Sequence, residues 1–412
     1  MRCSITGRAL RVLISGATVL SGVTVFSGVA VPAGVAGTRP TIKAHTTRAQ
    51  STRAQSTRAQ SARVLHVGPG RTLATPSAAA AVARSGDTVE IDAGVYPGDV
   101  ATWTQDHLTL RAVGGRVRLP AEGNSAQGKA IWVIAGDHTT ISGITFSGAR
   151  VPDGNGAGIR QEGAGLRVID CRFHHNQDGI LTSANPDSVI TIRRSRFAKN
   201  GAGDGYTHNL YIGQVKRFVL KGSTVQAARG GHEVKSRALA NRIVGNRILD
   251  KSSSANYSID LPNGGSALIA GNVIQQGPNS PNHTVISYGA EGATNPSHRI
   301  WVVNNTLVNA QTSGTYLSVP SGTDAHVWNN LFVGPGQPVS GGAKLVTNER
   351  VRAGFADPAR FDYRLLTGSG AIDAGSTPPA RFRAKWEWRE PARAVRRVVA
   401  GAWDLGAFEY RG

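Results

Sequence analysis

Val244-Gly-Asn-Arg-Ile248 and Ala270-Gly-Asn-Val-Ile274 are two copies of a short pattern that recurs through the middle of this chain. In each copy an aliphatic residue is followed by small or polar residues and then by a large apolar residue. The copies close at Phe146, Phe173, Phe197, Val225, Ile248, Ile274, Leu307 and Phe332. Subtracting successive positions gives steps of 27, 24, 28, 23, 26, 33 and 25 residues. A repeat of this period indicates stacked structural units. Units this short, rich in Gly, Asn, Val and Ile, predict the coils of an all-β, parallel β-helix.

Asparagines occupy one fixed place in four of these copies. They are Asn246, Asn272, Asn305 and, one residue out of register, Asn329 or Asn330. In stacked coils, amide side chains at equivalent places can bond to the copies above and below. We expect such a ladder inside the coils. The alternative is that asparagine is present only because it favours turns.

Composition agrees with a turn-rich β protein: 51 of 412 residues are glycine, and 17% are charged. The formal net charge is +20, and residues 1–63 hold nine Arg or Lys and no acid, so 20 − 9 leaves +11 for the remainder. A basic balance suggests a polyanionic partner. We expect an anionic polysaccharide rather than nucleic acid, because no basic stretch is interleaved with aromatic residues. We also expect a monomer.

The N-terminal region reads as a targeting segment. Three arginines precede an apolar, small-residue run at 12–35, which predicts a signal peptide over 1–36 and a secreted or periplasmic protein without a membrane span. A transmembrane anchor is the weaker alternative. A five-residue tandem repeat then predicts a disordered linker over 37–63. Cys171 would be the mature chain's one cysteine, and we expect a buried thiol there.

The remaining chain divides into an N-terminal cap over 64–107, coils over 108–334 and a C-terminal capping segment over 335–412. An Ala-rich helix is expected at 75–85, where it would cover the open end of the coils. The basic stretch 381–397 is expected to be a surface loop. The helix signal followed by Gly86-Asp-Thr-Val-Glu-Ile-Asp-Ala-Gly-Val-Tyr96 resembles the opening of pectate-lyase-like proteins. That resemblance implies a right-handed β-helix.

Polar residues alternate with core residues on the second strand of each coil, so their side chains should face outward. Stacking by this alternation places one outward column on successive coils: Arg160, Leu181, Tyr211, Lys235 and Asp260. His208, Asn209, His232 and Glu233 stand at the starts of the same strands, and Arg237 lies two residues beyond Lys235. Adjacent strands lie about 4.8 Å apart, so neighbours in this column could reach one substrate sugar.

These residue types suit β-elimination across a uronic acid. That reaction needs a base, an acid for the leaving oxygen and a cation that neutralises the carboxylate. Lys235 is the candidate base, and Tyr211 or Arg237 could serve the leaving group. Arg160, Arg237 or His232 could hold the carboxylate. The further substrate-binding candidates are His208, Asn209, Glu233, Asp260 and Tyr288, the last as a platform for a sugar ring.

Val234-Lys-Ser-Arg-Ala-Leu-Ala-Asn-Arg-Ile-Val-Gly-Asn246 resembles a motif of the alginate lyase and chondroitinase B family. The resemblance implies that Lys235 is the base. This chain departs from the family at the partner arginine, where it has Asp260, and at the calcium-binding glutamates, where it has Ala228 and Gly230. Calcium is therefore the one cofactor that the resemblance raises, and we assign no metal ligands.

Two other functions fit the same fold. A glycosidase would use paired carboxylates such as Glu233 and Asp260 on either side of a sugar bond. A non-catalytic β-helix would bind a polysaccharide without cleaving it, since the fold does not fix the function.

Overall fold

The computed structural model describes residues 63–412. The signal peptide predicted at 1–36 and nearly all of the predicted linker at 37–63 lie outside this range. Within it, no helix is both long and apolar enough to cross a membrane.

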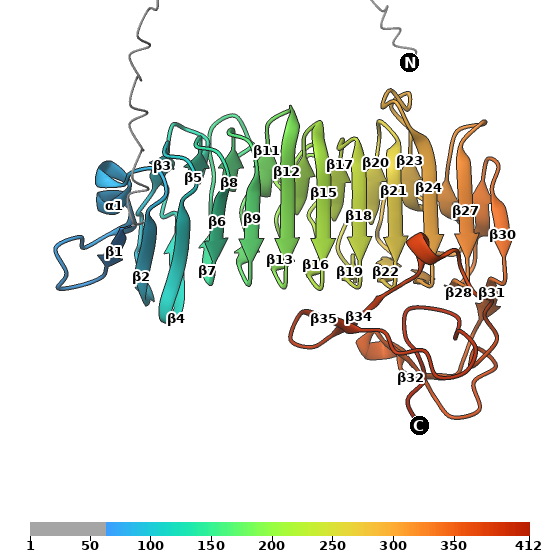
Figure 1. Cartoon of the computed structure of the whole chain (residues 1–412). Helices are drawn as coiled ribbons and strands as arrows, with labels where there is room; N and C mark the ends of the chain where they lie inside the picture. The colour runs from blue at the N-terminus through green and yellow to red at the C-terminus, as the bar shows by residue number, and fades with distance from the viewer. Residues whose placement is uncertain (1–62) are drawn as a thin grey trace, which may run out of the picture. The chain divides into compact units, whose positions relative to one another are not determined.

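The described chain winds into coils whose strands form two long parallel sheets (Figure 1). The smaller sheet, called the groove sheet below, has ten strands. They are β3 (Ala101–Trp103), β5 (Ala130–Ile134), β8 (Ala157–Gln161), β11 (Asp178–Thr182), β14 (Leu210–Ile212), β17 (Val234–Ser236), β20 (Ile259–Leu261), β23 (Thr284–Tyr288), β26 (Thr315–Ser318) and β29 (Gln337–Ser340).

The larger sheet, called the back sheet, has 21 strands, and most coils contribute two of them. They are β1 (Val64–Val67), β2 (Thr88–Val95), β4 (Thr109–Pro120), β6 (Thr139–Ser142), β7 (Ile144–Ser147), β9 (Leu166–Ile169), β10 (Arg172–His174), β12 (Asn185–Arg193), β13 (Arg196–Ala198), β15 (Val215–Lys221), β16 (Thr224–Gln226), β18 (Ala240–Val244), β19 (Arg247–Leu249), β21 (Gly265–Ala270), β22 (Val273–Gln276), β24 (His298–Val303), β25 (Thr306–Asn309), β27 (Asp324–Trp328), β28 (Leu331–Val333), β30 (Lys344–Val346) and β31 (Glu349–Val351).

The closing residues of the sequence repeat meet one another in the core. The eight closing residues, from Phe146 to Phe332, lie in parallel register, and each one is paired with the closing residue of the next coil. Phe146 stacks on Phe173 at 5.0 Å between ring centroids, and Phe173 stacks on Phe197 at 4.7 Å. The period therefore reflects one residue position per coil, and the predicted coil architecture is confirmed.

Parallel pairing extends beyond the predicted coil range of 108–334. At the N-terminal end β1 pairs with β2, and β2 pairs with β4. At the C-terminal end β28 pairs with β31 and β26 with β29. Both segments expected to be caps therefore contain strands that belong to coils. These strands pair with a neighbouring coil as the central strands do.

The N-terminal helix is present as α1 (Pro76–Val82), shorter than the predicted 75–85. Thr75 caps it, since its side chain accepts a hydrogen bond from the Ala78 amide, and proline stands in the first turn. Pro76, Ala79 and Ala80 are buried against the first coils. These small residues allow the helix to lie close to the end of the coil stack.

A buried column of amides, here called the first ladder, runs between the two strands that each coil gives to the back sheet. Asn246 Nδ2 donates to Asn272 Oδ1 at 3.0 Å, Asn272 to Asn305 at 2.9 Å, and Asn305 to Asn330 at 3.0 Å. The predicted ladder is confirmed, and Asn330 rather than Asn329 is its member. It continues to Asn348, which accepts from Asn330 at 2.9 Å.

The C-terminal segment folds back along the last coils (Figure 1). It comprises β32 (Phe355–Asp357), the 3₁₀ turn η1 (Pro358–Arg360), β33 (Asp362–Leu365), the 3₁₀ turn η2 (Ala380–Phe382), β34 (Trp386–Arg389) and β35 (Arg393–Arg396). The surface loop expected at 381–397 is wrong, because most of this stretch forms η2 and the antiparallel pair β34–β35. Its basic side chains had suggested full solvation, but apolar residues such as Trp388 and Ala384 are buried between them.

Glycines at one turn of three successive coils give this hairpin room. Gly222, Gly245 and Gly271 all have a positive φ. A Cβ at Gly222 would lie 2.3 Å from the Ala394 nitrogen, and one at Gly271 would lie 2.3 Å from the Trp386 oxygen. These three glycines therefore have two structural roles. They adopt the left-handed backbone conformation of the turn, and their lack of a side chain lets the C-terminal hairpin pack closely against the coils.

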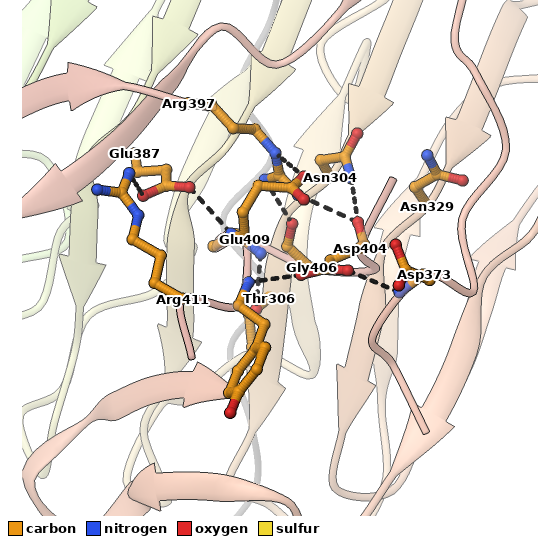
Figure 2. Close-up of polar contacts among 12 residues, drawn as sticks. Asn304, Thr306, Asn329, Asp373, Glu387, Arg397, Asp404, Gly406, Glu409 and Arg411 are labelled. Atoms are coloured by element: carbon orange, nitrogen blue, oxygen red, sulfur yellow. Dashed lines mark hydrogen bonds and ion pairs between the residues drawn. The ribbon is translucent and has the colours of Figure 1, made fainter. Parts of the chain in front are cut away.

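Buried ionic groups fasten the end of the chain (Figure 2). Arg397 Nε pairs with Glu409 Oε1 at 2.5 Å, and the same guanidinium donates to the carbonyl oxygens of Asp404 and Gly406. Asn304 Nδ2 donates to the Asp404 carbonyl at 2.8 Å, which links the tail to a coil. Asp404 and Glu409 are thus structural groups of the C-terminal segment.

Candidate functional site

The predicted outward column is present on the groove sheet. Arg160 pairs in register with Leu181, Leu181 with Tyr211, Tyr211 with Lys235, and Lys235 with Asp260. These side chains alternate with core residues such as Leu210 and Val234, which are fully buried. The strands are therefore what hold the five side chains in one line.

A groove of about 680 Å³ lies over four of these strands. Its lining includes the predicted residues Arg160, His208, Tyr211, Lys235 and Arg237. The loops at 153–155 and 204–207 form part of its wall. The structure thus brings five of the ten predicted site residues into one concave surface.

Two carboxylates face Lys235. Its Nζ lies 3.1 Å from Glu291 Oε1 and 3.6 Å from Asp260 Oδ2. Asp260 is almost fully buried, whereas Glu291 is 46% exposed at the side chain. Lys235 is therefore held by one buried carboxylate, that of Asp260, and by one exposed carboxylate, that of Glu291.

Arg237 joins Tyr211 to this network. Its Nε donates to the Tyr211 phenol oxygen at 2.8 Å, and its Nη2 lies 2.7 Å from Glu291 Oε2. Partial burial opposes the charged form of Arg237, but the bonds to Tyr211 and Glu291 outweigh it and raise the pKa. Because the phenol oxygen accepts from Arg237, the phenol hydrogen can be donated to a ligand in the groove.

Two buried histidines lie beside the column. The His208 ring stacks on His232 at 4.8 Å and on Tyr211 at 5.5 Å between centroids. Burial, and then the positive charge of its neighbours, hold the pKa of His208 well below its usual range. His232 Nε2 lies 3.3 Å from Asp260 Oδ2. His232 and Asp260 therefore support Lys235 from beneath the surface, while the neutral His208 ring lines the groove.

Asn209 and Glu233 do not face the groove, so their prediction as substrate-binding residues is wrong. Both are fully buried. They end a column here called the second ladder, in which Asn176 donates to Asn200 at 3.0 Å and Asn200 to Asn209 at 2.7 Å. Asn209 Nδ2 then donates to Glu233 Oε2 at 2.5 Å.

The error has a simple geometric reason. β14 and β17 begin at Leu210 and Val234, so the residue before each strand belongs to the corner of the coil. Strand alternation does not apply there, and this residue turns inward with the core. Desolvation consequently raises the pKa of Glu233 to about 8.

Tyr288 is also a correction. It is the last residue of β23 and is buried, and its hydroxyl donates to the Gly265 carbonyl at 2.7 Å. Ile286 pairs with the core residue Ile259, and Tyr288 pairs with Leu261. Tyr288 therefore points inward, and Ser287 stands in line with Asp260.

Sequence reasoning missed the aspartates of the groove. Asp178 and Asp204 line it, and desolvation raises the pKa of Asp178 to about 8. The Asp178 carboxylate accepts a hydrogen bond from the His208 amide at 2.8 Å. The coil register that identified His208 at the start of its strand could have identified Asp178, because both stand two residues before a paired core residue, Ile180 or Leu210.

The residues at the places implied for calcium do not fit that ion. Ala228 and Gly230 offer no side-chain oxygen, and the Ala228 amide donates to Glu233. Among residues 63–412, no group of three or more His, Cys, Asp or Glu side chains has the arrangement of a metal site. No step below involves a metal ion.

Comparisons with known proteins agree with this architecture. The family described as "Right handed beta helix region" matches residues 121–248. The crystal structure of pectate lyase Pel9A is 17% identical, with a TM-score of 0.60 over 85% of this chain and 96% of that one. No curated protein sequence matches this chain.

Two further solved structures are similar over part of the chain. The Geobacillus virus E2 protein ORF18 is 12% identical, with a TM-score of 0.44 over 68% of this chain and 58% of that one. The alginate lyase from Paenibacillus sp. str. FPU-7 is 16% identical, with a TM-score of 0.38 over 67% and 96%. The family match and the likeness to pectate lyase Pel9A confirm the predicted fold, a right-handed parallel β-helix.

Proposed function

We propose that the groove binds an acidic, uronic-acid-containing polysaccharide and cleaves it by β-elimination. The observation that carries this proposal is the convergence of Tyr211, Lys235 and Arg237 in one groove, linked by a hydrogen bond and by a shared carboxylate. These groups offer a base, a proton donor and a fixed positive charge.

The cations of the groove suit the substrate carboxylate. Arg160 lines the groove, and its buried Nε has no hydrogen-bond partner among residues 63–412, the nearest carboxylate oxygen being Glu162 Oε1 at 3.8 Å. Arg237 remains charged, as its raised pKa requires. Guanidinium groups bind carboxylates in a bidentate manner and stabilise the charge that develops when the neighbouring proton leaves.

In the proposed reaction, neutral Lys235 takes the proton from the carbon next to the carboxylate. The electron pair of that C–H bond forms a carbon–carbon double bond, and the bond to the glycosidic oxygen breaks. Tyr211 donates its phenol proton to the leaving oxygen. Glu291 and Asp260 hold the Lys235 side chain in place for this step.

Three further observations support this assignment. Val234-Lys-Ser236 matches a lyase motif, the protein is basic, and its fold is also that of a pectate lyase. An acidic polysaccharide outside the cell would agree with the signal peptide predicted at 1–36, so secretion is part of the proposal.

The test is an assay on a panel of uronic-acid polymers that follows the absorbance of the unsaturated product. Lys235→Met should lower turnover by about a thousandfold, the usual effect of removing a general base. Lys216→Met is the matched control and should retain activity, because Lys216 is exposed on β15 and is not one of the residues that line the groove. A Lys235→Met protein with full activity would exclude this mechanism.

Of the two alternatives, the structure removes one pairing. Glu233 cannot act with Asp260 as a glycosidase pair, since its carboxyl group lies in the second ladder. A non-catalytic binder would bind the acidic polymers without forming product. Binding should weaken with salt in either case, because salt screens the attraction between the polymer's carboxylates and Arg160, Lys235 and Arg237.

A further inference from the structure

The back sheet has another hollow, on a different sheet from the strands that line the groove. It has a volume of about 420 Å³ and lies between four neighbouring strands, β15, β18, β21 and β24, and the turn η2 (Figure 1 labels these strands). We call it the arginine pocket. Its lining comprises Arg217, Val219, Ala240, Asn241, Arg242, Ser266, Ala267, Leu268, Arg299, Arg381 and Phe382.

Side-chain size along one outward column creates the hollow. Arg217 is in register with Ala240, Ala240 pairs with Ser266, and Ser266 pairs with Arg299. Two coils with small side chains thus separate two coils with long cationic ones. At about 4.8 Å per strand, the two arginines stand roughly 14 Å apart along the coil axis.

The charge in this pocket is almost entirely unbalanced. Four arginines line it and no acidic residue does. Arg299 pairs with Asp324, but within residues 63–412 no ion pair or side-chain hydrogen bond involves Arg217, Arg242 or Arg381. Burial, followed by repulsion from Arg217, lowers the pKa of Arg242. Gathering unpaired cations is unfavourable for the folded protein by itself, so the cluster is better explained by an anionic ligand.

Apolar surface accompanies these charges. Phe382 stacks on Trp301 with 3.8 Å between ring centroids and an interplanar angle of 10°. Val219 and Leu268 provide further apolar lining, and the Arg381 guanidinium lies 4.5 Å from the centre of the Phe382 ring. Guanidinium groups around a partly apolar surface suit a sugar that carries a carboxylate. The sugar ring can pack against the apolar side chains while the guanidinium groups bind its carboxylate.

We propose that the arginine pocket is a binding site for an acidic polysaccharide, separate from the groove. Arg217, Arg242 and Arg381 would contact its carboxylates, and Phe382 and Leu268 would contact its sugar rings. The site lies on the other sheet, so it does not depend on whether the groove cleaves the polymer. A polysaccharide chain bound in the arginine pocket would keep the protein attached to the polysaccharide.

Calorimetric titration with oligogalacturonate tests the proposal. The background variant Lys235→Met prevents turnover during the measurement. Adding Arg242→Gln and Arg381→Gln should weaken one binding event by about tenfold or more, since hydrogen bonds to charged groups contribute about 1.5–3 kcal/mol each. The melting temperature should change little, because neither arginine has an ion pair or a side-chain hydrogen bond within residues 63–412 to lose. The contact removed is that of Arg381 with the Phe382 ring.

The matched control is Arg167→Gln. Arg167 is exposed, occupies the same outward column as Arg242 three coils away and has no ion pair within residues 63–412. It should leave binding unchanged. An equal loss in Arg167→Gln would show diffuse attraction to the basic surface and overturn the proposal, as would unchanged affinity in the Arg242→Gln, Arg381→Gln protein.

A further comparison addresses the ligand chemistry. The neutral methyl ester of the same oligosaccharide should lose the binding event that depends on Arg242 and Arg381. Inorganic polyphosphate should bind more weakly there than oligogalacturonate, because it offers no apolar ring face to Phe382. Equal binding of polyphosphate would overturn the assignment to a polysaccharide.

Discussion

Two buried columns of polar side chains run along successive coils of the same β-helix, and they differ in how they end. In the first ladder each asparagine donates to the next and to a backbone carbonyl, from Asn246 to Asn348. Every member is a neutral amide. The second ladder begins in the same way, at Asn176 and Asn200, but ends at the carboxyl group of Glu233.

The difference shows how a structural column can become sensitive to its surroundings. Both carboxyl oxygens of Glu233 accept hydrogen bonds. One accepts from the side-chain amide of Asn209, and the other accepts from the main-chain amide of Ala228. Those hydrogen bonds favour the carboxylate, but complete burial dominates and raises the pKa to about 8. The first ladder should therefore stabilise the fold at every pH, and the second should not.

The largest expected effect comes from cutting the first ladder. Asn272→Leu removes the acceptor shared by the side-chain and main-chain N–H groups of Asn246, and it removes the side-chain donor to Asn305, so both buried neighbours lose hydrogen bonds. We expect the free energy of unfolding to fall by about 4 kcal/mol, measured by denaturant titration. Asn279→Leu, at an exposed amide, is the control and should change stability by less than about 0.5 kcal/mol. A small loss in Asn272→Leu would mean that the ladder is dispensable.

The second expected effect is a loss of stability as the pH rises. Above about 4.5 the unfolded chain has released the Glu233 proton, while the folded protein keeps it until about pH 8. The folded state then binds more protons, so stability falls by about 1.4 kcal/mol per pH unit for such a group. From pH 6.5 to 8 this amounts to roughly 2 kcal/mol. Asp178, whose pKa is also raised to about 8, acts in the same direction.

The variant that sharpens this prediction is Glu233→Gln. It should remove Glu233's share of the pH dependence and lower stability at pH 5, because an amide places a donor where both partners require an acceptor. His208 adds a separate effect below pH 6.5, where its lowered pKa means that the unfolded chain takes up a proton first. A pH dependence identical to that of the unmodified protein would show that Glu233 is ionised throughout.

The third expected effect is on enzymatic activity, which a substitution in the second ladder should lower and a substitution in the first ladder should not. Asn209 and Glu233 directly precede Leu210-Tyr211 and Val234-Lys235, so the second ladder fixes the start of two strands that line the groove. Asn209→Ala should lower kcat in the lyase assay by about tenfold, through misplacement of Tyr211 and Lys235. Asn246→Ala should reduce stability and leave the activity of the folded protein intact. Equal activity of both folded variants would contradict this distinction.

The smallest effect is expected at Cys171. Its amide donates to Ser195 Oγ at 3.2 Å, and Ser195 in turn bonds to Ser223, which bonds to Asn246 of the first ladder. Cys171→Ser should change stability by less than about 1 kcal/mol, because serine already fills this place in the next two coils. Burial raises the pKa of the Cys171 thiol to about 12, so a thiol reagent should not label Cys171 in the folded protein.

The sequence by itself was sufficient where the repeat is regular. The closing apolar residues, the first ladder and the column from Arg160 to Asp260 follow from spacing, because each coil presents the same position to its neighbours. Local alternation also places Lys235 and Tyr211 outward, since both lie within a strand.

Tertiary structure decided what lies at corners and between distant segments. Asn209 and Glu233 turn inward because they precede a strand, and the spacing of the second ladder, from 176 to 200 to 209 to 233, has no fixed period. The arginine pocket needs η2, which lies far along the chain from β15. Sequence periodicity reports only contacts that repeat from coil to coil, whereas a corner or a docked tail depends on the path of the whole chain.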